Sequence, residues 1–420
     1  MIFEQALLSK LTRRLIPFMF VLYIVSYLDR INVGFAALRL NEALNFDPAV
    51  FGLGAGIFFI GYFLFEVPSN LIMERVGARI WMARILVTWG IISSAMMFLN
   101  GRLMFYVLRF LLGIAEAGFF PGMILYLTYW FPAEARGRAV ARFMTATAIA
   151  GVIGGPISGF LLAMDGAVGL AGWQWLFLIE GIPAIVLGFI TLAYLPDGPK
   201  HASWLEDEEK EWIVLRLQRE RDEARSHSHH TLREALRSTR VWTLAFIYFA
   251  VIMSFYGISL WLPQIVQSFS GVSDLAVGFI SAVPYVAASI GMVILGKNSD
   301  RTRERRVHVA LSAFAGATGL VAAAFLKNPV AELAALSLAA IGIWGTLGPF
   351  WAMSSEILSG TGAAAGIALI NSVGNLGGFL GPYLVGLVRK QTDTFALPLL
   401  ALAVWPLIGA VVTLANRLRR

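Results

Sequence analysis

Four ionisable side chains, Asp29, Arg30, Arg109 and Glu116, lie within two otherwise apolar stretches of the sequence. A charged side chain inside a membrane-spanning helix costs about 2.5–3.5 kcal/mol on insertion scales, so such residues usually carry function. Arg109 and Glu116 are seven residues apart, about two helical turns, which places them on one helix face. Asp29 and Arg30 lie near the middle of their own stretch. Two arginines and two carboxylates at similar depth predict an anion-binding site beside proton acceptors.

The residue types define the chemistry of such a site. An arginine guanidinium stays charged and presents a two-pronged donor to a carboxylate. We therefore predict that Arg109 is the main carboxylate anchor and that Arg30 also binds the anion. A proton that reaches Asp29 or Glu116 can release an arginine from its internal partner and make it available to a substrate. The alternatives are a static buried ion network and, for Arg30, an orientation toward lipid headgroups.

The second part of the chain has no ionisable residue in the middle of an apolar stretch. Its candidate binding residues are neutral hydrogen-bonding side chains: Tyr256, Gln264, Trp344, Asn371 and Asn375. Asn371 and Asn375 are one turn apart and could bind hydroxyl groups, or equally could hold two helices together. In the first part, Glu66 and Glu180 are expected to have structural roles.

The elements that position these residues are membrane helices. Hydrophobic residues make up 58% of the 420 positions and charged residues 14%, with a mean hydropathy of +0.72, whereas soluble domains carry about a quarter charged residues. About 20 apolar residues suffice to cross the hydrocarbon core. We predict an all-α polytopic membrane protein with twelve transmembrane helices. Their approximate ranges are 15–38, 51–73, 80–100, 103–128, 139–163, 174–195, 241–266, 274–297, 307–326, 332–354, 363–388 and 396–415.

A polar segment over 197–240 separates two hydrophobic parts and holds ten acidic and nine basic residues. We predict an N-terminal six-helix half over 1–196, a cytoplasmic linker over 197–240 and a C-terminal six-helix half over 241–420. Basic residues gather in the loops after the second, fourth and eighth predicted helices, and such loops stay in the cytoplasm. We therefore expect a multi-pass protein of the inner (plasma) membrane with both termini cytoplasmic.

Charge and motif content exclude several other classes of function. The net charge of +7 and the pI near 9.7 come from short basic loops, so they indicate membrane topology and not a nucleic-acid partner. No phosphate-cradling Gly-x-x-x-x-Gly-Lys-Ser/Thr motif occurs, so we expect neither ATP-driven transport nor a cofactor. A short tract of His227, His229 and His230 has no accompanying ligands, and no metal site is expected.

Two unrelated motifs recur at one spacing of 226 residues. The first joins a carboxylate to an arginine, at Glu74-Arg75 and again at Asp300-Arg301. The second is a pair of glycines followed by proline. Its two copies are Gly151, Gly155 and Pro156, and Gly377, Gly381 and Pro382. The shared spacing predicts parallel halves related by an axis along the membrane normal, an architecture known among transporters.

These features resemble the major facilitator superfamily over essentially the whole chain. Its loop motif, roughly Gly-x-x-x-Asp-Arg-x-Gly-Arg-Arg, is matched in part by Glu74-Arg75-x-Gly77 and by Gly296-x-x-x-Asp300-Arg301. This sequence departs from it at Asn70, Glu74, Ala78 and Arg303. The resemblance implies ion pairs that latch the two halves together on the cytoplasmic side, and plain topology-setting loops are the alternative. The expected gating residues are Glu74, Arg75, Arg136, Asp300 and Arg301.

Within that superfamily the chain is similar to the anion:cation symporter family, most of all to its tartrate and hydroxyphenylacetate permease branch. The strings that carry the similarity are Tyr27-Leu-Asp29-Arg30-Ile-Asn32, Arg109-Phe-Leu-Leu-Gly113-Ile-Ala-Glu116, Phe131-Pro132-x-x-x-Arg136 and Phe255-Tyr256-Gly-Ile-Ser-Leu-Trp261-Leu-Pro263-Gln264. The similarity implies a proton-coupled symporter of small organic anions such as tartrate, sugar acids or aromatic carboxylates. It places Tyr27 in the substrate site. Tyr62 matches a substrate-contacting position in sugar-acid relatives, with core packing as its alternative.

Two other functions stay open at this point. One is a proton-antiporting exporter of amphipathic compounds, because Gly155-Pro156-x-x-Gly159 faintly resembles an exporter motif. The other is an integral-membrane enzyme or receptor. Against that reading, no Ser/His/Asp or His/Glu cluster is evident and the two-half repeat suits alternating access. We expect a monomer in the lipid bilayer, without enzyme activity, whose partners are a small organic anion and a proton.

Overall fold

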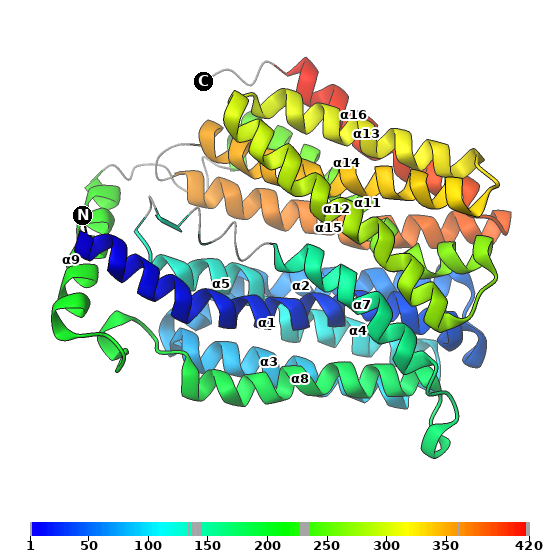
Figure 1. Ribbon diagram of the computed structural model, residues 1–420, viewed down its shortest axis with the longest axis horizontal. Helices are drawn as coiled ribbons and strands as arrows, with labels where there is room; N and C mark the ends of the chain where they lie inside the picture. Colours follow the sequence, from blue (N-terminus) through cyan, green and yellow to red (C-terminus); the bar gives the residue numbers. More distant parts are fainter. Residues whose placement is uncertain are drawn as a thin grey trace.

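The computed structural model describes residues 2–132, 135–136, 139, 145–226, 236–358 and 362–416. Within these ranges the chain is helical and has no strand, which confirms the predicted all-α class (Figure 1). Ten described segments are long and apolar enough to cross a membrane, and α7 and α15 lie at the two remaining predicted positions. The main helices are α1 (Ile2–Ala43), α2 (Pro48–Val76), α3 (Ala78–Ala95), α4 (Arg102–Glu116), α5 (Phe119–Thr128), α7 (Ala146–Leu162), α8 (Gly172–Tyr194), α9 (Asp207–Ser226), α11 (Thr239–Ser270), α12 (Asp274–Thr302), α13 (Arg305–Phe325), α14 (Pro329–Ile357), α15 (Gly362–Thr392) and α16 (Ala396–Ala415).

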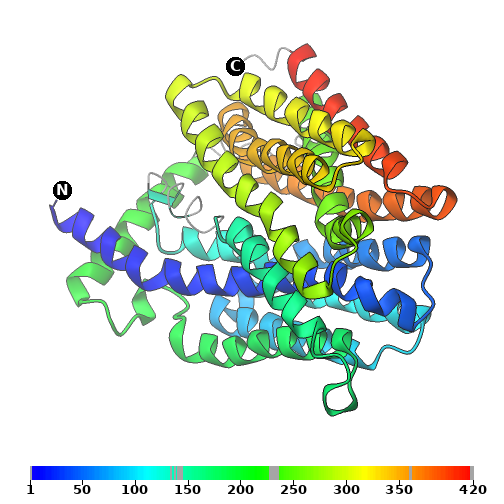
Figure 2. The same ribbon diagram turned by 45° about the vertical axis from the view of Figure 1, so that its right-hand side comes forward.

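The helices form two bundles, α1–α8 and α11–α16, which lie one above the other in Figure 1. Most contact between the bundles comes from α2 packed against α15 and α7 packed against α12, while α1 packs against α11. The linker helix α9 lies beside the N-terminus, at one end of the N-terminal bundle (Figures 1 and 2). The predicted functional residues of α1 and α11 therefore lie on helices that meet at the boundary between the two bundles.

Repeat-related glycines allow the closest contacts between the bundles. Gly52 on α2 lies against α15, where an added Cβ atom would be 2.6 Å from the Pro382 carbonyl oxygen, and Gly155 on α7 lies against the Gly278 backbone of α12. Gly52 and Gly278 are separated by the repeat spacing of 226 residues, as are Pro156 and Pro382. The two contacts are therefore equivalent under the internal repeat, and the spacing seen in the sequence also describes how the halves pack.

The fourth predicted span, 103–128, is broken in its middle. Helix α4 ends at Glu116, and α5 follows after Ala117, which is extended (φ −55°, ψ 132°), and Gly118, which is left-handed (φ +84°). A Cβ atom at position 118 would collide with the Ser69 hydroxyl of α2. The apolar pattern does not reveal this break, because both half-helices are equally apolar. The break places Glu116 at the C-terminal end of a half-helix in the interior of the bundle.

Replacing Gly118 with alanine is expected to lower the thermal unfolding temperature of the protein in detergent. A left-handed conformation costs a non-glycine residue about 1–2 kcal/mol, and the new methyl group also meets Ser69. Gly296 in α12 has open space around it, so Gly296→Ala is the matched control and should be neutral or stabilise by up to about 1 kcal/mol. An unchanged unfolding temperature for Gly118→Ala would show that Gly118 does not impose the break.

Two ion pairs join the bundles at the end away from the N-terminus. Lys390 Nζ on α15 lies 2.8 Å from the Asp47 carboxylate at the start of α2, and Arg39 Nε on α1 lies 2.6 Å from the Asp274 carboxylate on α12. The hydrogen bonds from Lys390 and from the Val50 backbone N–H hold the pKa of the Asp47 carboxyl below its usual range. The Lys390–Asp47 pair therefore stays ionised at neutral and weakly acidic pH, so it does not itself sense protons.

The predicted loop motifs lie at the opposite end and make no comparable pair in this conformation. Glu74 and Arg75 are exposed and have no ion pair within the described ranges. Asp300 pairs with Arg305 of its own half, with 2.5 Å between Oδ1 and Nη1, and Arg301 is exposed. Among the described residues, ion pairs across the halves occur at one end only, and the cytoplasmic latch stays a prediction.

The linker helix α9 is held to the N-terminal bundle. Lys10 Nζ lies 2.6 Å from Glu209 of α9, and Arg136 Nη2 lies 3.6 Å from Glu220 of the same helix. Trp204, just before α9, stacks on Trp130 with ring centroids 5.6 Å apart. The predicted gating residue Arg136 therefore contacts the linker in this conformation.

Candidate functional site

Arg30 and Glu116 form an ion pair buried between α1 and the end of α4. Nη2 of Arg30 donates a hydrogen bond to Oε1 of Glu116, and Ser26 Oγ donates to the same oxygen at 2.9 Å. The two side chains are 8% and 0% exposed. Nε of Arg30 and Oε2 of Glu116 have no hydrogen-bond partner among the described residues. Each member of the pair therefore keeps one hydrogen-bonding position for another group.

Arg30 also contacts the other half of the protein. Its Nη1 donates to the Tyr256 hydroxyl on α11 at 3.0 Å, and the two residues are 226 positions apart. Gly34 and Leu260 have the same spacing, and their backbones meet one turn further along the two helices. Residues that are equivalent in the repeat and touch each other must lie next to the axis that relates the halves. The Arg30 ion pair is therefore central in the molecule, at the boundary between the bundles.

Aromatic rings of α2 surround this ion pair. The Arg30 guanidinium carbon lies 5.5 Å from the ring centroid of Phe58 and 5.4 Å from that of Tyr62. Phe59 packs on Tyr256 with ring centroids 4.3 Å apart. Cation–π contacts of this kind strengthen when the groups are removed from water. Tyr62, predicted as a substrate contact, is thus placed beside the same guanidinium.

The side chain of Asp29 points in a different direction from that of its neighbour Arg30. One carboxylate oxygen accepts a hydrogen bond from Trp89 Nε1 at 2.7 Å, and the other accepts from Ser93 Oγ and from Asn32 Nδ2, the latter at 3.2 Å. Trp89 and Ser93 belong to α3, inside the N-terminal bundle. Adjacent helical residues point about 100° apart. The four predicted charges therefore do not form one cluster, because Asp29 faces α3 while the Arg30 pair faces the other half.

Arg109 is fully buried and has no carboxylate partner among the described residues. Its Nε and Nη2 donate to the backbone carbonyl oxygens of Gly54 and Ala55 on α2, at 3.4 and 3.1 Å. Its guanidinium carbon lies 5.0 Å from the Phe58 ring centroid, and its Nη1 has no partner. The structure thus holds Arg109 between α4 and α2, whereas Arg30 is the arginine that reaches the opposite half.

The predicted asparagines of α15 form a third group together with Glu66 of α2. Asn371 Nδ2 donates to one Glu66 oxygen at 2.7 Å and Ser372 Oγ donates to the other at 3.3 Å, while Asn375 also interacts with this carboxylate. Glu66 is only 4% exposed. Asn371 therefore joins two helices across the boundary between the halves in this conformation. It would have to leave Glu66 before it could bind a substrate.

Three buried donor groups make no hydrogen bond of ordinary geometry with any of the described residues. They are the hydroxyls of Tyr27 and Tyr285 and Nε1 of Trp344, and each residue is at most 2% exposed. The ring centroids of Tyr285 and Trp344 are 5.6 Å apart, and the hydroxyls of Tyr27 and Tyr285 both interact with the Ser259 side chain of α11. Unpaired buried donors are uncommon in folded proteins, so these three groups are candidates for contact with a ligand. Sequence reasoning missed Tyr285, because a single tyrosine in an apolar helix looks like core.

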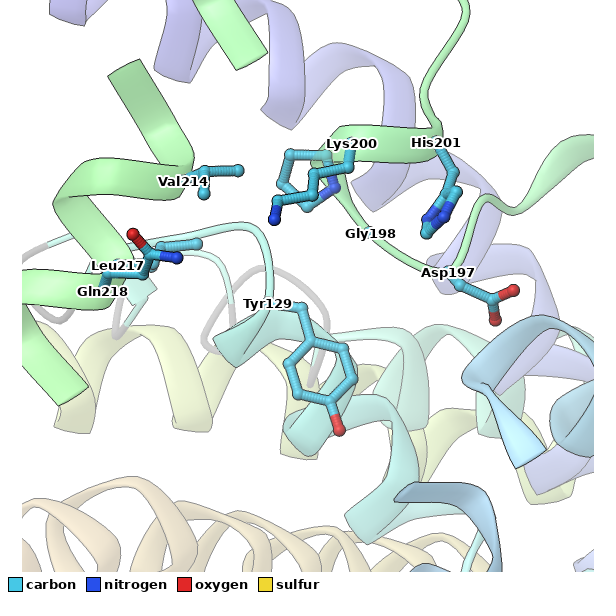
Figure 3. Close-up of a pocket in the computed structure, with 9 residues that line it drawn as sticks. Tyr129, Asp197, Gly198, Lys200, His201, Val214, Leu217 and Gln218 are labelled. Carbon is cyan, nitrogen blue, oxygen red and sulfur yellow. The ribbon is translucent and has the colours of Figure 1, made fainter. Parts of the chain in front are cut away.

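Two further features lie away from this centre. Gln264 Oε1 accepts a hydrogen bond from Asn41 at 3.3 Å, close to the Arg39–Asp274 ion pair. A pocket of about 370 Å³ lies between the linker and the N-terminal bundle, and Figure 3 shows Lys200 and Gln218 around it. None of the predicted substrate or proton residues lines that pocket.

No group of three or more potential metal ligands occurs in the part of the chain that the structure describes. The tract of His227, His229 and His230 lies outside the described residues. The arrangement offers instead a buried cation with a displaceable carboxylate, unpaired donors on both halves and a second carboxylate within one bundle. These groups are chemically able to bind an anion at the boundary between the two bundles.

Comparison with known proteins identifies the family to which the chain belongs. The chain is 50% identical over 411 residues, which is 98% of this chain and 94% of the relative, to an Agrobacterium vitis protein provisionally named a tartrate transporter. It is 44% identical over 411 residues, 98% of this chain and 95% of the relative, to a quinolone resistance transporter of Acinetobacter baumannii. A solved bacterial homologue of the lysosomal transporter Spinster, inward-facing and occupied, superposes with a TM-score of 0.78 at 16% identity over 95% of each chain. The family description Major Facilitator Superfamily matches residues 19–382. The chain therefore belongs to the Major Facilitator Superfamily of membrane transporters.

Proposed function

We propose that this transporter takes up small organic anions together with protons by alternating access, and that the Arg30–Glu116 pair couples the two. The observation that carries the proposal is the place of this pair, where one guanidinium binds a carboxylate of its own half and the Tyr256 hydroxyl of the other. A substrate carboxylate on Arg30 would contact both halves at once, as alternating access about a fixed site requires. The relatives named as tartrate transporters support the anion class.

The proposed coupling is an exchange of partners at Arg30. A proton adds to Glu116, whose Oε2 is unpaired, and the neutral carboxyl attracts the guanidinium less than the carboxylate does. Arg30 then presents two N–H donors to a substrate carboxylate. After release of the substrate on the other side, Glu116 loses its proton and the internal pair forms again. Asp29 is the second proton acceptor in this proposal.

The unpaired donors favour a substrate with acceptors at both ends. In this proposal Arg30 binds one carboxylate of the substrate. The Tyr27, Tyr285 and Trp344 donors bind a second acceptor, such as a hydroxyl or another carboxylate. A site that supplies hydrogen bonds to hydroxyl groups rejects an analogue without them, because its buried donors then stay unpaired. We therefore propose hydroxy-dicarboxylates such as tartrate first, and sugar acids or aromatic carboxylates second.

A second candidate function is the export of amphipathic compounds in exchange for protons. The observation that favours it is the 44% identity to a protein named as a quinolone resistance transporter. Symport and antiport differ in the direction of coupled proton flow, so one assay separates them. An inward proton gradient drives substrate into vesicles in a symporter and out of them in an antiporter.

Labelled tartrate should accumulate above equilibrium in proteoliposomes that have an inward proton gradient, and a protonophore should abolish the accumulation. In competition, unlabelled tartrate should inhibit uptake more strongly than succinate, the matched control with the same carbon skeleton and no hydroxyl groups. Tyr285→Phe should reduce this difference, because it removes one unpaired donor. Binding of lipophilic cations only, without competition by any carboxylate, would contradict the anion proposal.

The topology belongs to the same proposal. Both termini and the linker are placed in the cytoplasm, in the inner membrane, because the basic loops lie on their side. The closed end with its Lys390–Asp47 pair is then periplasmic. The units that move are the halves over 1–196 and 241–420, joined by the linker over 197–240, and one chain in the bilayer is the transporting unit.

A further inference from the structure

A further buried carboxylate of the N-terminal bundle has no cation partner in the described part of the chain. Glu180 on α8 is 7% exposed. Its Oε1 accepts a hydrogen bond from Ser158 Oγ on α7 at 2.7 Å, and its Oε2 has no partner among the described residues. A glutamine would keep the bond to Ser158 without the cost of about 2.5–3.5 kcal/mol that a charge incurs in a membrane span. Packing alone therefore does not account for a carboxyl group here.

Asn32 connects Glu180 to Asp29. Its amide nitrogen donates to Asp29 Oδ1 at 3.2 Å, and the same side chain interacts with Glu180. Asn32 is 1% exposed, so water does not compete freely for these contacts. One amide thus lies between two buried carboxylates, one on α1 and one on α8.

The surroundings of Glu180 contain few other charges. Helix α8 packs against α1, α3 and α7. Asp29 of α1 is the charged residue that interacts with Glu180, and α7 has no ionisable residue. On α3, Arg79 and Arg84 lie toward the opposite end of the helix from Ser94, which is next to Gly181 of α8. A proton on Glu180 is therefore governed mainly by Asp29.

Polar atoms continue from Glu180 toward the start of α8. Trp173, seven residues earlier, is 5% exposed and its Nε1 has no partner in the described part of the chain. A separation of seven residues is about two helical turns, so the indole and the carboxyl share one face of α8. This face leads to the end of the bundle where the Arg39–Asp274 and Lys390–Asp47 ion pairs join the two halves.

We propose that Glu180 is a third proton-binding carboxylate, beside Glu116 and Asp29, and that it exchanges protons with Asp29 past Asn32, by a route inside the N-terminal half that is separate from the substrate path. The O–H bond of protonated Glu180 breaks as a bond forms to a single water molecule that enters beside Asn32, and an O–H bond of that water breaks as one forms on Asp29. Glu180 is then reloaded from water at the Trp173 end. The route lets protons reach Asp29 while the ion pairs keep the substrate path closed.

This inference rests on the proposed proton symport, so the wild-type protein is measured first. Proteoliposomes that contain a pH-sensitive dye report protons that enter with tartrate, and labelled tartrate reports uphill uptake and exchange. Glu180→Gln is expected to slow proton entry and uphill uptake by about tenfold or more, as loss of a positioned proton-transfer group does. Exchange of tartrate should change by less than about twofold, because exchange needs no net proton transfer. Glu180→Asp should restore coupling in part.

Glu332→Gln is the matched control, because Glu332 is a buried carboxyl (9% exposed) in the other half and should leave all three readouts unchanged. Asn32→Ala tests the link independently and should reproduce the loss of coupling. Wild-type proton entry in Glu180→Gln or Asn32→Ala would overturn the relay and leave the symport proposal intact. Equal loss of exchange and of uphill uptake in both variants would also overturn it, since that pattern means a structural role. Absence of tartrate-dependent proton entry in the wild type would refute the symport itself.

Discussion

Lysine in place of Arg30 is expected to abolish effective substrate uptake while the protein still folds and inserts. Lysine keeps the positive charge but loses the planar fork that binds a carboxylate with two hydrogen bonds. It also cannot hold Glu116 and Tyr256 at the same time with the geometry seen here. Hydrogen bonds to charged groups contribute about 1.5–3 kcal/mol each, so the apparent affinity should fall by about 10- to 100-fold.

The measurement is tartrate affinity by competition, together with uphill uptake and the thermal unfolding temperature. Arg102→Lys is the matched control, because Arg102 is exposed at the start of α4, and it should behave as wild type. Wild-type tartrate affinity in Arg30→Lys would remove Arg30 from the substrate site and with it the proposed exchange of partners.

Arg109→Lys should give a different pattern of effects. The Arg109 guanidinium donates to the carbonyl oxygens of Gly54 and Ala55 and stacks on Phe58, so lysine there should first lower the unfolding temperature. Any loss of uptake should follow from this loss of stability. A specific loss of tartrate affinity at an unchanged unfolding temperature would instead make Arg109 the main anchor, as the sequence alone predicts.

The different placements of Arg30 and Arg109 show that the sequence predicts helix positions better than side-chain directions. Hydropathy depends on composition along the chain, so it located the membrane helices well; the predicted span 396–415 coincides with α16. The 226-residue spacing is also seen in the structure, because residues that are equivalent in the repeat occupy equivalent places in the two halves. It even accounts for the contact between Arg30 and Tyr256 at the repeat axis.

The direction in which each side chain points could not be predicted in the same way. Asp29 and Arg30 are adjacent, yet α3 supplies Trp89 and Ser93 to the former while the other half meets the latter. Which neighbour a helix face meets depends on packing between distant segments, and a single sequence does not contain that information in readable form. The break at Gly118 was missed for a related reason. It is set by the contact with α2 and not by any local loss of hydrophobicity.

The second large effect should come from neutralising the two proposed proton acceptors, Glu116 and Asp29. Glu116→Gln imitates a permanently protonated carboxyl. Its amide oxygen can still accept from Ser26, but it no longer holds Arg30 by charge. Tartrate binding should therefore persist and become less dependent on pH, whereas uphill accumulation driven by a proton gradient should be lost.

Asp29→Asn should lose uphill accumulation as well, with an additional cost in stability. Trp89 and Asn32 both point N–H donors at this carboxylate, and an asparagine amide offers only one acceptor oxygen, so one donor is left unpaired at a cost of about 1–3 kcal/mol. The unfolding temperature should fall for Asp29→Asn and hold for Glu116→Gln.

Exchange of tartrate across sealed vesicles separates coupling from binding in these variants. Both single variants should retain exchange. In exchange the transporter crosses the membrane with substrate bound in both directions, and this step needs no net gain or loss of a proton. The double variant should combine intact exchange with no accumulation. If all three still concentrate tartrate at the wild-type level, Asp29 and Glu116 do not carry the proton. The buried carboxyls of Glu66 and Glu180, or a different coupling ion, would then have to account for the driving force.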